Sequence, residues 1–227
     1  MTSFTILLTT VAMALFTLFT GCHNDREPAA ARPADPPASQ GTIVAVGDSL
    51  TAGYGVPPSD AYPALLEKKL ILAGHRWQVI NAGISGETSS GTLSRIDWIL
   101  KHKPDIVILE TGANDGLRGV APQLTRRNID RIVTLFQEKD VVVVLAGMQA
   151  LRNMGGPFTR EFAAIYPAVA KKYDLILVPF FLADVAGDQA LNLGDGIHPS
   201  AKGYRMITDT IYPYLLQAIE RKRDGHR

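Results

Sequence analysis

The stretch Thr42-Ile43-Val44-Ala45-Val46-Gly47-Asp48-Ser49-Leu50 decides the fold. It begins with apolar and β-branched residues whose polarity does not alternate, which is typical of a strand covered on both faces. Glycine and small polar residues then end the strand abruptly, and the hydroxyl of Ser49 stands in that turn. A buried strand followed by a short polar turn is the start of a repeating α/β unit.

Further runs of the same kind follow along the chain. They cover residues 77–80, 105–109, 141–145 and 175–178. Amphipathic stretches between and after them predict helices near residues 61–73, 88–101, 122–138, 158–172 and 201–221. This alternation indicates parallel strands joined by helical crossovers. We therefore predict a three-layer α/β/α sandwich with a five-stranded parallel sheet, which is a flavodoxin-like fold.

Composition excludes several classes of protein. The chain has 227 residues, with 23 Lys+Arg against 22 Asp+Glu, 46% hydrophobic residues and one cysteine. A formal net charge of +1 argues against a dedicated nucleic-acid binder, which needs a strongly basic surface. One cysteine allows neither an internal disulfide nor a cysteine-rich zinc site. The fold therefore depends on its hydrophobic core, and we expect no metal and no obligate protein partner.

The first 40 residues differ from the rest of the chain. Residues 1–21 carry no charged side chain and contain an apolar run, which predicts an export signal. A short membrane anchor is the alternative, but the run is short for about 30 Å of hydrocarbon. Residues 23–40 hold four prolines and five alanines, which predicts a tether. We divide the chain into a signal at 1–22, the tether, a folded domain at 41–222 and a charged tail at 223–227.

Glycine and small polar residues follow each of the first three predicted strands. These loops cover residues 47–55, 81–88 and 110–116. Ligands of such sheets bind at the carboxyl ends of the strands. Glycine there lets backbone N–H groups come close to a ligand. We therefore expect the functional site where these loops meet.

A carboxylate stands three residues before a histidine in Asp195-Gly196-Ile197-His198-Pro199-Ser200. At this spacing, Asp195 can fold back in a turn and accept the Nδ1 proton of His198, which leaves Nε2 free as a base. A serine hydroxyl is a poor nucleophile until a neighbouring base removes its proton. We therefore predict a serine hydrolase in which Ser49, Asp195 and His198 are catalytic.

The tetrahedral intermediate of such a reaction needs hydrogen-bond donors for its oxyanion, and losing one donor typically costs about a hundredfold or more in rate. Our candidates are the backbone N–H groups of Ser49 and Gly86 and the side-chain amide of Asn114. Each motif alone also fits a structural role, such as a capped turn or a helix entry. Their joint occurrence at successive strand ends favours the hydrolase.

Together these residues resemble the SGNH, or GDSL, hydrolase family, whose four signature blocks carry Ser, Gly, Asn and His. The blocks stand here as Ser49 in Gly47-Asp48-Ser49-Leu50, Gly86 in Ile84-Ser85-Gly86-Glu87-Thr88, Asn114 in Gly112-Ala113-Asn114-Asp115, and Asp195 with His198. The resemblance covers residues 41–216 and is closest to the bacterial multifunctional thioesterase, lysophospholipase and arylesterase branch. It implies an acyl-enzyme mechanism without metal or organic cofactor, and an acyl ester or thioester as substrate.

The same resemblance bears on residues around the blocks. Arg118 matches a mobile substrate-contacting loop of that branch, which implies that Arg118 faces the bound acyl chain or head group; an exposed arginine is the alternative. Asp48 is expected to contact substrate or to support the nucleophile turn. Residues 151–157 depart from the branch, which usually has a proline near Leu151 and an aromatic residue near Met154.

Phe19-Thr20-Gly21-Cys22 resembles the lipobox of bacterial lipoproteins, although the usual leucine is Phe19 here and no basic residue precedes the apolar run. The resemblance implies that Cys22 is lipidated and that the protein is anchored to a membrane of the bacterial cell envelope, facing the periplasm. A cleaved signal without lipid is the alternative.

Two other functions fit the same residues. One is an esterase that removes O-acetyl groups from cell-envelope glycans, because the same catalytic residues could serve it. The other is a non-catalytic, flavodoxin-like binding module whose glycine loops hold an anionic ligand. Neither a GxGxxG nor a GxxxxGK(S/T) fingerprint accompanies those loops, which argues against the binding module.

Overall fold

The computed structural model describes residues 39–225. The predicted export signal, Cys22 and nearly all of the predicted tether lie outside these residues. The first strand begins at Gly41, where the sequence predicts the start of the folded domain. Within the described range, no helix combines the length and apolar character needed to cross a membrane.

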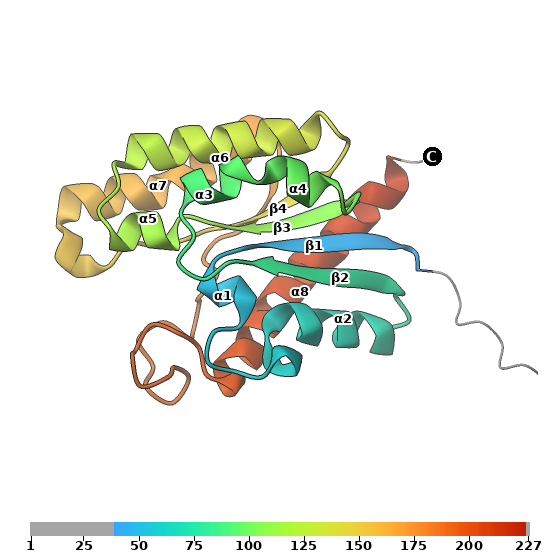
Figure 1. Ribbon diagram of the computed structural model, residues 1–227, viewed down its shortest axis with the longest axis horizontal. Coiled ribbons are helices and arrows are strands. Elements are labelled where there is room, and N and C mark those ends of the chain that lie inside the picture. The colour runs from blue at the N-terminus through green and yellow to red at the C-terminus, as the bar shows by residue number, and fades with distance from the viewer. Residues whose placement is uncertain (1–38, 226–227) are drawn as a thin grey trace, which may run out of the picture. The chain divides into compact units, whose positions relative to one another are not determined.

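Five parallel strands form one sheet in the order β2-β1-β3-β4-β5 (Figure 1). They are β1 (Gly41–Gly47), β2 (Trp77–Gly83), β3 (Ile106–Glu110), β4 (Val142–Ala146) and β5 (Ile176–Val178). The predicted five-stranded parallel sheet is thus confirmed. Because β1 lies between β2 and β3, the strand order reverses beside β1, and ligand sites of such sheets form at that point.

Helices cover both faces of the sheet. They are α1 (Ser49–Ala52), α2 (Tyr62–Leu72), α3 (Ser89–Ser94), α4 (Ile96–Leu100), α5 (Ala113–Leu117), α6 (Pro122–Gln137), α7 (Gly156–Tyr173) and α8 (Ala201–Asp224), with short 3₁₀ turns at Pro58–Asp60 and Arg152–Met154. Figure 1 shows α2 and α8 on one face, and α3, α4, α6 and α7 on the other. This is the predicted three-layer sandwich.

The central strands are the most buried part of the molecule. Every residue of β3 is buried, and so are residues 43–47 of β1. Fully burying a side chain such as valine, leucine or isoleucine contributes about 1.5–3 kcal/mol to folding. The loops at the carboxyl ends of these two strands therefore start from a rigid platform.

Two helices differ from their predicted extents. The predicted helix at 88–101 is interrupted at Arg95, where the backbone has φ −113° and ψ 14°. The last helix continues to Asp224, three residues beyond the predicted extent of 201–221, and so includes the first two residues of the charged tail at 223–227. Basic side chains dock the end of this helix, because Arg221 Nη1 donates to the Asp174 carbonyl at 2.5 Å and Lys222 Nζ to the Asp140 carbonyl at 2.8 Å.

Candidate active site

Ser49 is the first residue of α1, directly after β1 and its turn. Asp48 caps this short helix, since its Oδ1 accepts a hydrogen bond from the Leu50 N–H at 2.9 Å. Gly47 makes the turn possible, because a Cβ there would lie 2.1 Å from Thr51 Oγ1 and 2.3 Å from Glu110 Oε2. The glycine therefore lets the turn pack tightly on β3 while Ser49 stands at the edge of the sheet.

Ser49, His198 and Asp195 form a continuous hydrogen-bonded chain. The distance from Ser49 Oγ to His198 Nε2 is 2.9 Å, and that from His198 Nδ1 to Asp195 Oδ2 is 2.6 Å. The fold thus brings together three residues from opposite ends of the domain's sequence, as predicted.

Hydrogen bonding keeps Asp195 ionised. The backbone N–H of His198, the His198 ring and the backbone N–H of Ile197 donate to this carboxylate and lower the pKa of Asp195 to about 2. An ionised carboxylate only accepts hydrogen bonds, so the proton of the ring lies on Nδ1. His198 Nε2 is then free to accept the hydroxyl proton of Ser49.

Local contacts fix the loop that carries His198. Leu193 N–H donates to the His198 carbonyl at 2.7 Å, and Asn192 pairs with Pro199 in an antiparallel bridge. The ring of Tyr54 packs on the His198 ring with their centroids 4.5 Å apart. The imidazole is therefore positioned on one side by its own loop and on the other by the loop that follows the nucleophile.

The predicted oxyanion donors lie at the ends of β1, β2 and β3 and line one cavity. Asn114 Nδ2 donates one hydrogen to Asp48 Oδ2 at 2.9 Å, which leaves its second hydrogen for a ligand. Gly86 has φ +79°, and a Cβ there would meet no atom closer than 3.5 Å, so its backbone conformation rather than its surroundings requires glycine. Within residues 39–225, the backbone N–H groups of Ser49 and Gly86 donate to no other group.

Arg118 and Asp48 are placed by contacts within the protein. Arg118 Nη2 donates to the Gly86 carbonyl at 2.8 Å, and Arg118 is not among the residues that line the cavity. It therefore links the end of α5 to the loop of Gly86. Asp48 does line the cavity, but it is almost completely buried and both of its oxygens accept intramolecular hydrogen bonds.

A cavity of about 840 Å³ opens beside Ser49. Apolar side chains supply most of its wall: Leu50, Tyr54, Leu117, Met148, Leu151, Phe180, Leu182 and Ile197. The polar reacting groups, Ser49, His198 and Asn114, belong to the same wall. An apolar cavity with a few convergent polar groups is typical of a small-molecule site and suits a ligand with a hydrocarbon chain.

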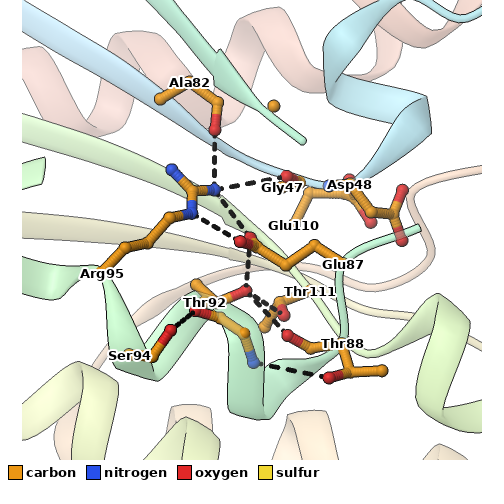
Figure 2. Close-up of polar contacts among 12 residues, drawn as sticks. Gly47, Asp48, Ala82, Glu87, Thr88, Thr92, Ser94, Arg95, Glu110 and Thr111 are labelled. Atoms are coloured by element: carbon orange, nitrogen blue, oxygen red, sulfur yellow. Dashed lines mark hydrogen bonds and ion pairs between the residues drawn. The ribbon is translucent and has the colours of Figure 1, made fainter. Parts of the chain in front are cut away.

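A partly buried ion pair, which no local sequence pattern indicates, supports the loop of Gly86 (Figure 2). Arg95 Nε lies 2.7 Å from Glu87 Oε1, and Arg95 Nη2 lies 2.7 Å from Glu87 Oε2. The same Nη2 donates to the carbonyls of Ala82 at 2.7 Å and Gly47 at 3.4 Å. Arg95 thus ties the carboxyl ends of β1 and β2 to the residue that follows Gly86.

A buried carboxylate also holds the segment of Asn114. Asp115 accepts hydrogen bonds from the Ser89 N–H at 2.8 Å, the Ser89 hydroxyl at 2.5 Å and the Thr125 hydroxyl at 3.0 Å. These contacts join α5 to the start of α3 and to α6. Among residues 39–225, no three His, Cys, Asp or Glu side chains are grouped so as to hold a metal ion.

Comparisons with known proteins agree with this geometry. Residues 45–206 match the model of the GDSL-like lipase/acylhydrolase family. Esterase TesA of Pseudomonas aeruginosa is 38% identical over 179 residues, covering 78% of this chain and 89% of that protein. Thioesterase 1/protease 1/lysophospholipase L1 of Escherichia coli K12 is 38% identical over 177 residues, covering 76% of this chain and 82% of that protein.

Solved structures agree as well. The crystal structure of TesA superposes with a TM-score of 0.75 at 38% identity, covering 78% of this chain and 99% of that one. The family match spans most of the folded domain, including the first three signature blocks and the Asp195 and His198 pair. The chain therefore belongs to the GDSL-like lipase/acylhydrolase family.

Proposed function

We propose that this protein is an esterase that hydrolyses acyl esters and thioesters through a covalent acyl-enzyme on Ser49. The observation that carries the proposal is the 2.9 Å contact between Ser49 Oγ and His198 Nε2, at the polar side of an apolar cavity. The orientation of His198 by an ionised Asp195 supports it, because that hydrogen bond selects the tautomer that a general base needs.

In the acylation step, His198 Nε2 takes the proton of Ser49 while Oγ bonds to the carbonyl carbon of the substrate. The carbonyl oxygen becomes an oxyanion that accepts hydrogen bonds from the Ser49 and Gly86 N–H groups and the Asn114 amide. When the intermediate collapses, the bond to the leaving oxygen or sulfur breaks, and His198 returns its proton to the departing alcohol or thiol.

In the deacylation step, a water molecule repeats this sequence on the acyl-enzyme. His198 takes one proton of the water, whose oxygen bonds to the acyl carbon, and the same donors stabilise the second oxyanion. Collapse breaks the bond to Ser49 Oγ, which recovers its proton from His198. The free acid leaves, and the enzyme returns to its starting state.

We propose that the acyl part of the substrate is a hydrocarbon chain rather than an acetyl group. The cavity is larger than an acetyl group needs, and its apolar wall extends from Ile197 and Leu117 to Leu151 and Phe180. The names of the relatives support this proposal, since they include an esterase and a thioesterase with lysophospholipase activity. Leu151 belongs to the stretch that departs from the resembling branch, so we expect a chain-length preference different from that of these relatives.

A panel of substrates tests the proposal. We would assay the wild-type protein on aryl esters of graded acyl length, an acyl thioester and a lysophospholipid, alongside Ser49→Ala. The matched control is Ser94→Ala, because the Ser94 hydroxyl bonds only the Gly91 carbonyl on an exposed helix end. We expect rates that rise beyond acetyl in wild type and control and vanish in Ser49→Ala. Release of acetyl alone would favour the glycan O-acetyl esterase, and no release from any substrate would contradict the proposal.

We also propose that the protein is exported and lipidated at Cys22. The support is the sequence alone, namely the uncharged apolar run and the small residues before the cysteine. Expression of the full chain in a bacterial host, followed by separation of membrane and soluble fractions, tests this. We expect wild type in the membrane fraction and Cys22→Ser outside it, and equal partitioning of the two would overturn the proposal.

A further inference from the structure

A second carboxyl group, that of Glu110, lies under the nucleophile turn and takes no part in the triad. Glu110 is the last residue of β3 and has no solvent-exposed surface. Its Oε2 accepts a hydrogen bond from the Asp48 N–H at 3.1 Å and from the Thr51 hydroxyl at 2.9 Å. Its Oε1 is buried and receives no hydrogen from any described donor.

The Glu110 carboxyl lies beside Asp48, whose backbone N–H donates to Glu110 Oε2, and the charge of the Asp48 carboxyl acts on that of Glu110. Asp48 is itself 1% exposed, and its oxygens already accept from the Leu50 N–H and the Asn114 amide. Two neighbouring carboxylates buried away from water repel each other, and protonation of one removes both the repulsion and one buried charge. Because Glu110 Oε2 already accepts two hydrogen bonds, the buried Oε1 atom, which accepts none from the described residues, is the atom on which a proton can lie.

Within residues 39–225, no lysine, arginine or histidine forms an ion pair with Glu110 or Asp48. Arg95 lies nearby, but its guanidinium is engaged by the carboxylate of Glu87 (Figure 2). The other titratable groups that face the pair are Tyr62 from α2, Tyr166 from α7 and Tyr204 from α8, with His198 acting on Asp48. The tyrosines supply no positive charge. Two adjacent carboxylates in such surroundings do not both ionise.

Burial and the nearby Asp48 charge both act on Glu110. Burial, followed by that charge, raises the pKa of Glu110 well above its ordinary value. Burial also raises the pKa of Asp48, but the hydrogen bonds from Leu50 and Asn114 and the charge of His198 oppose that rise. The proton therefore belongs on Glu110, and the negative charge on Asp48.

We propose that Glu110 is a positioning residue that keeps one proton and holds Asp48 through the Asp48 N–H, while the Asp48 carboxylate aims the Asn114 amide at the oxyanion. The chain of contacts runs from Glu110 through Asp48 to Asn114: the Asp48 N–H donates to Glu110 Oε2 at 3.1 Å, and Asn114 Nδ2 donates to Asp48 Oδ2 at 2.9 Å. Because Asp48 holds one amide hydrogen of Asn114, the other hydrogen points in a fixed direction. Glu110 touches neither substrate nor nucleophile, and it acts through the orientation of Asn114.

Glu110→Gln is the decisive variant, because its amide reproduces a protonated carboxyl. Its carbonyl can accept from the Asp48 N–H and the Thr51 hydroxyl as Glu110 Oε2 does, and the side chain carries no charge. We expect kcat and KM within about threefold of wild type, whereas Glu110→Ala lowers kcat about tenfold to a hundredfold at unchanged KM, as loss of a transition-state contact does. If Glu110 instead acts as a carboxylate, Glu110→Gln loses tenfold or more in kcat, and the proposal is overturned.

Stability against pH gives a second readout that does not depend on the Ala variant folding. A carboxyl whose pKa is raised in the folded state stabilises that state fully below its unfolded pKa of about 4.5, and this contribution is lost as pH rises. The unfolding constant of wild type relative to Glu110→Gln is therefore expected to stay flat below pH 4.5 and then rise by up to about tenfold per pH unit.

The matched control is Glu138→Gln, whose side chain is 56% exposed and lies 3.9 Å from Arg131. Denaturant titrations of the three proteins between pH 4 and pH 9 make the comparison. The unfolding constant of the control is expected to follow that of wild type at every pH. A divergence between Glu110→Gln and wild type is therefore caused by the loss of the Glu110 carboxyl. If the ratio of the unfolding constants of wild type and Glu110→Gln stays flat above pH 4.5, Glu110 is an ordinary, ionised carboxylate and the proposal is overturned.

Discussion

Two aspartates serve the two halves of the site under opposite conditions. The side chain of Asp195 is 39% exposed, and hydrogen bonds from His198 and Ile197 lower its pKa to about 2. Asp48 is 1% exposed, and burial raises its pKa. The same type of side chain is therefore a firmly ionised anchor in a surface loop and one member of a buried pair of carboxyls in the core.

The difference shows how the protein separates two tasks. The exposed loop at Asp195 and His198 carries the proton transfer, which needs a mobile proton and a base that water can reach. The buried layer of Asp48, Glu110 and Asn114 carries the geometry of the oxyanion hole, which needs rigidity. We expect substitutions in the loop to reduce activity with little effect on folding, and substitutions in the buried layer to change both.

The largest expected effect comes from Asp195→Asn. The amide keeps the size of the side chain but stabilises the wrong tautomer of His198, so we expect kcat to fall about a thousandfold to ten-thousandfold. Because Asp195 is exposed, the melting temperature at pH 7 is expected to change little. Steady-state kinetics and calorimetry on the same preparation check this, and a variant with more than a tenth of wild-type kcat would contradict the assigned role.

A smaller effect is expected from Asn114→Ala. Removing the amide deletes one oxyanion donor, so kcat is expected to fall about a hundredfold at unchanged KM. It also leaves Asp48 Oδ2 without its 2.9 Å donor, so the melting temperature is expected to fall as well. Loss of activity without loss of stability would mean that Asn114 does not hold the buried layer as we describe.

Glycine substitutions sharpen the comparison between the two halves. Gly86 and Gly196 have φ values of +79° and +70°, and a Cβ at either position would lie no closer than 3.5 Å to another residue's atoms. Each change to Ala is therefore expected to cost about 1–2 kcal/mol of backbone strain. We expect Gly86→Ala to slow acylation about tenfold through the oxyanion donor. We expect Gly196→Ala to weaken the contact between Asp195 and His198. The NMR signal of the His198 Nδ1 proton can distinguish the two variants, because that proton lies in this contact and not in the oxyanion hole.

The smallest expected effect belongs to Arg118→Met. The guanidinium bonds the Gly86 carbonyl from an exposed position, so its loss loosens one attachment of the oxyanion loop without removing a donor. We expect kcat to fall about twofold to fivefold with little change in KM, in line with the modest worth of one exposed hydrogen bond. A large rise in KM for charged lysophospholipids alone would instead show that Arg118 contacts the head group.

The sequence predicted those parts of the site that local patterns encode. Ser49, Gly86 and Asn114 follow apolar runs that predict strands, and Asp195 lies three residues before His198, so strand ends and short spacing were sufficient. Glu110 escaped prediction because the residue it contacts, Asp48, is 62 residues away and becomes its neighbour only through the pairing of β1 with β3. Such contacts depend on sheet register rather than on a local pattern.

The helices, like the site residues, were predicted where a local sequence pattern encodes them and missed where none does. Long amphipathic helices such as α6 were predicted within a few residues, because several turns display the helical period. Helices α1 and α5 have four and five residues, too few to show a period, and both were missed. The break at Arg95 was also missed; this residue pairs with Glu87, a contact that no helical period displays.

The most direct test of the account is labelling of Ser49 by a fluorophosphonate, followed by intact mass spectrometry. We expect wild type to gain a single adduct located on the peptide of Ser49, Asp195→Asn to react far more slowly, and Ser49→Ala to gain none. An unmodified wild-type protein, or an adduct that persists in Ser49→Ala, would contradict the claim that His198 and Asp195 activate Ser49 as the nucleophile.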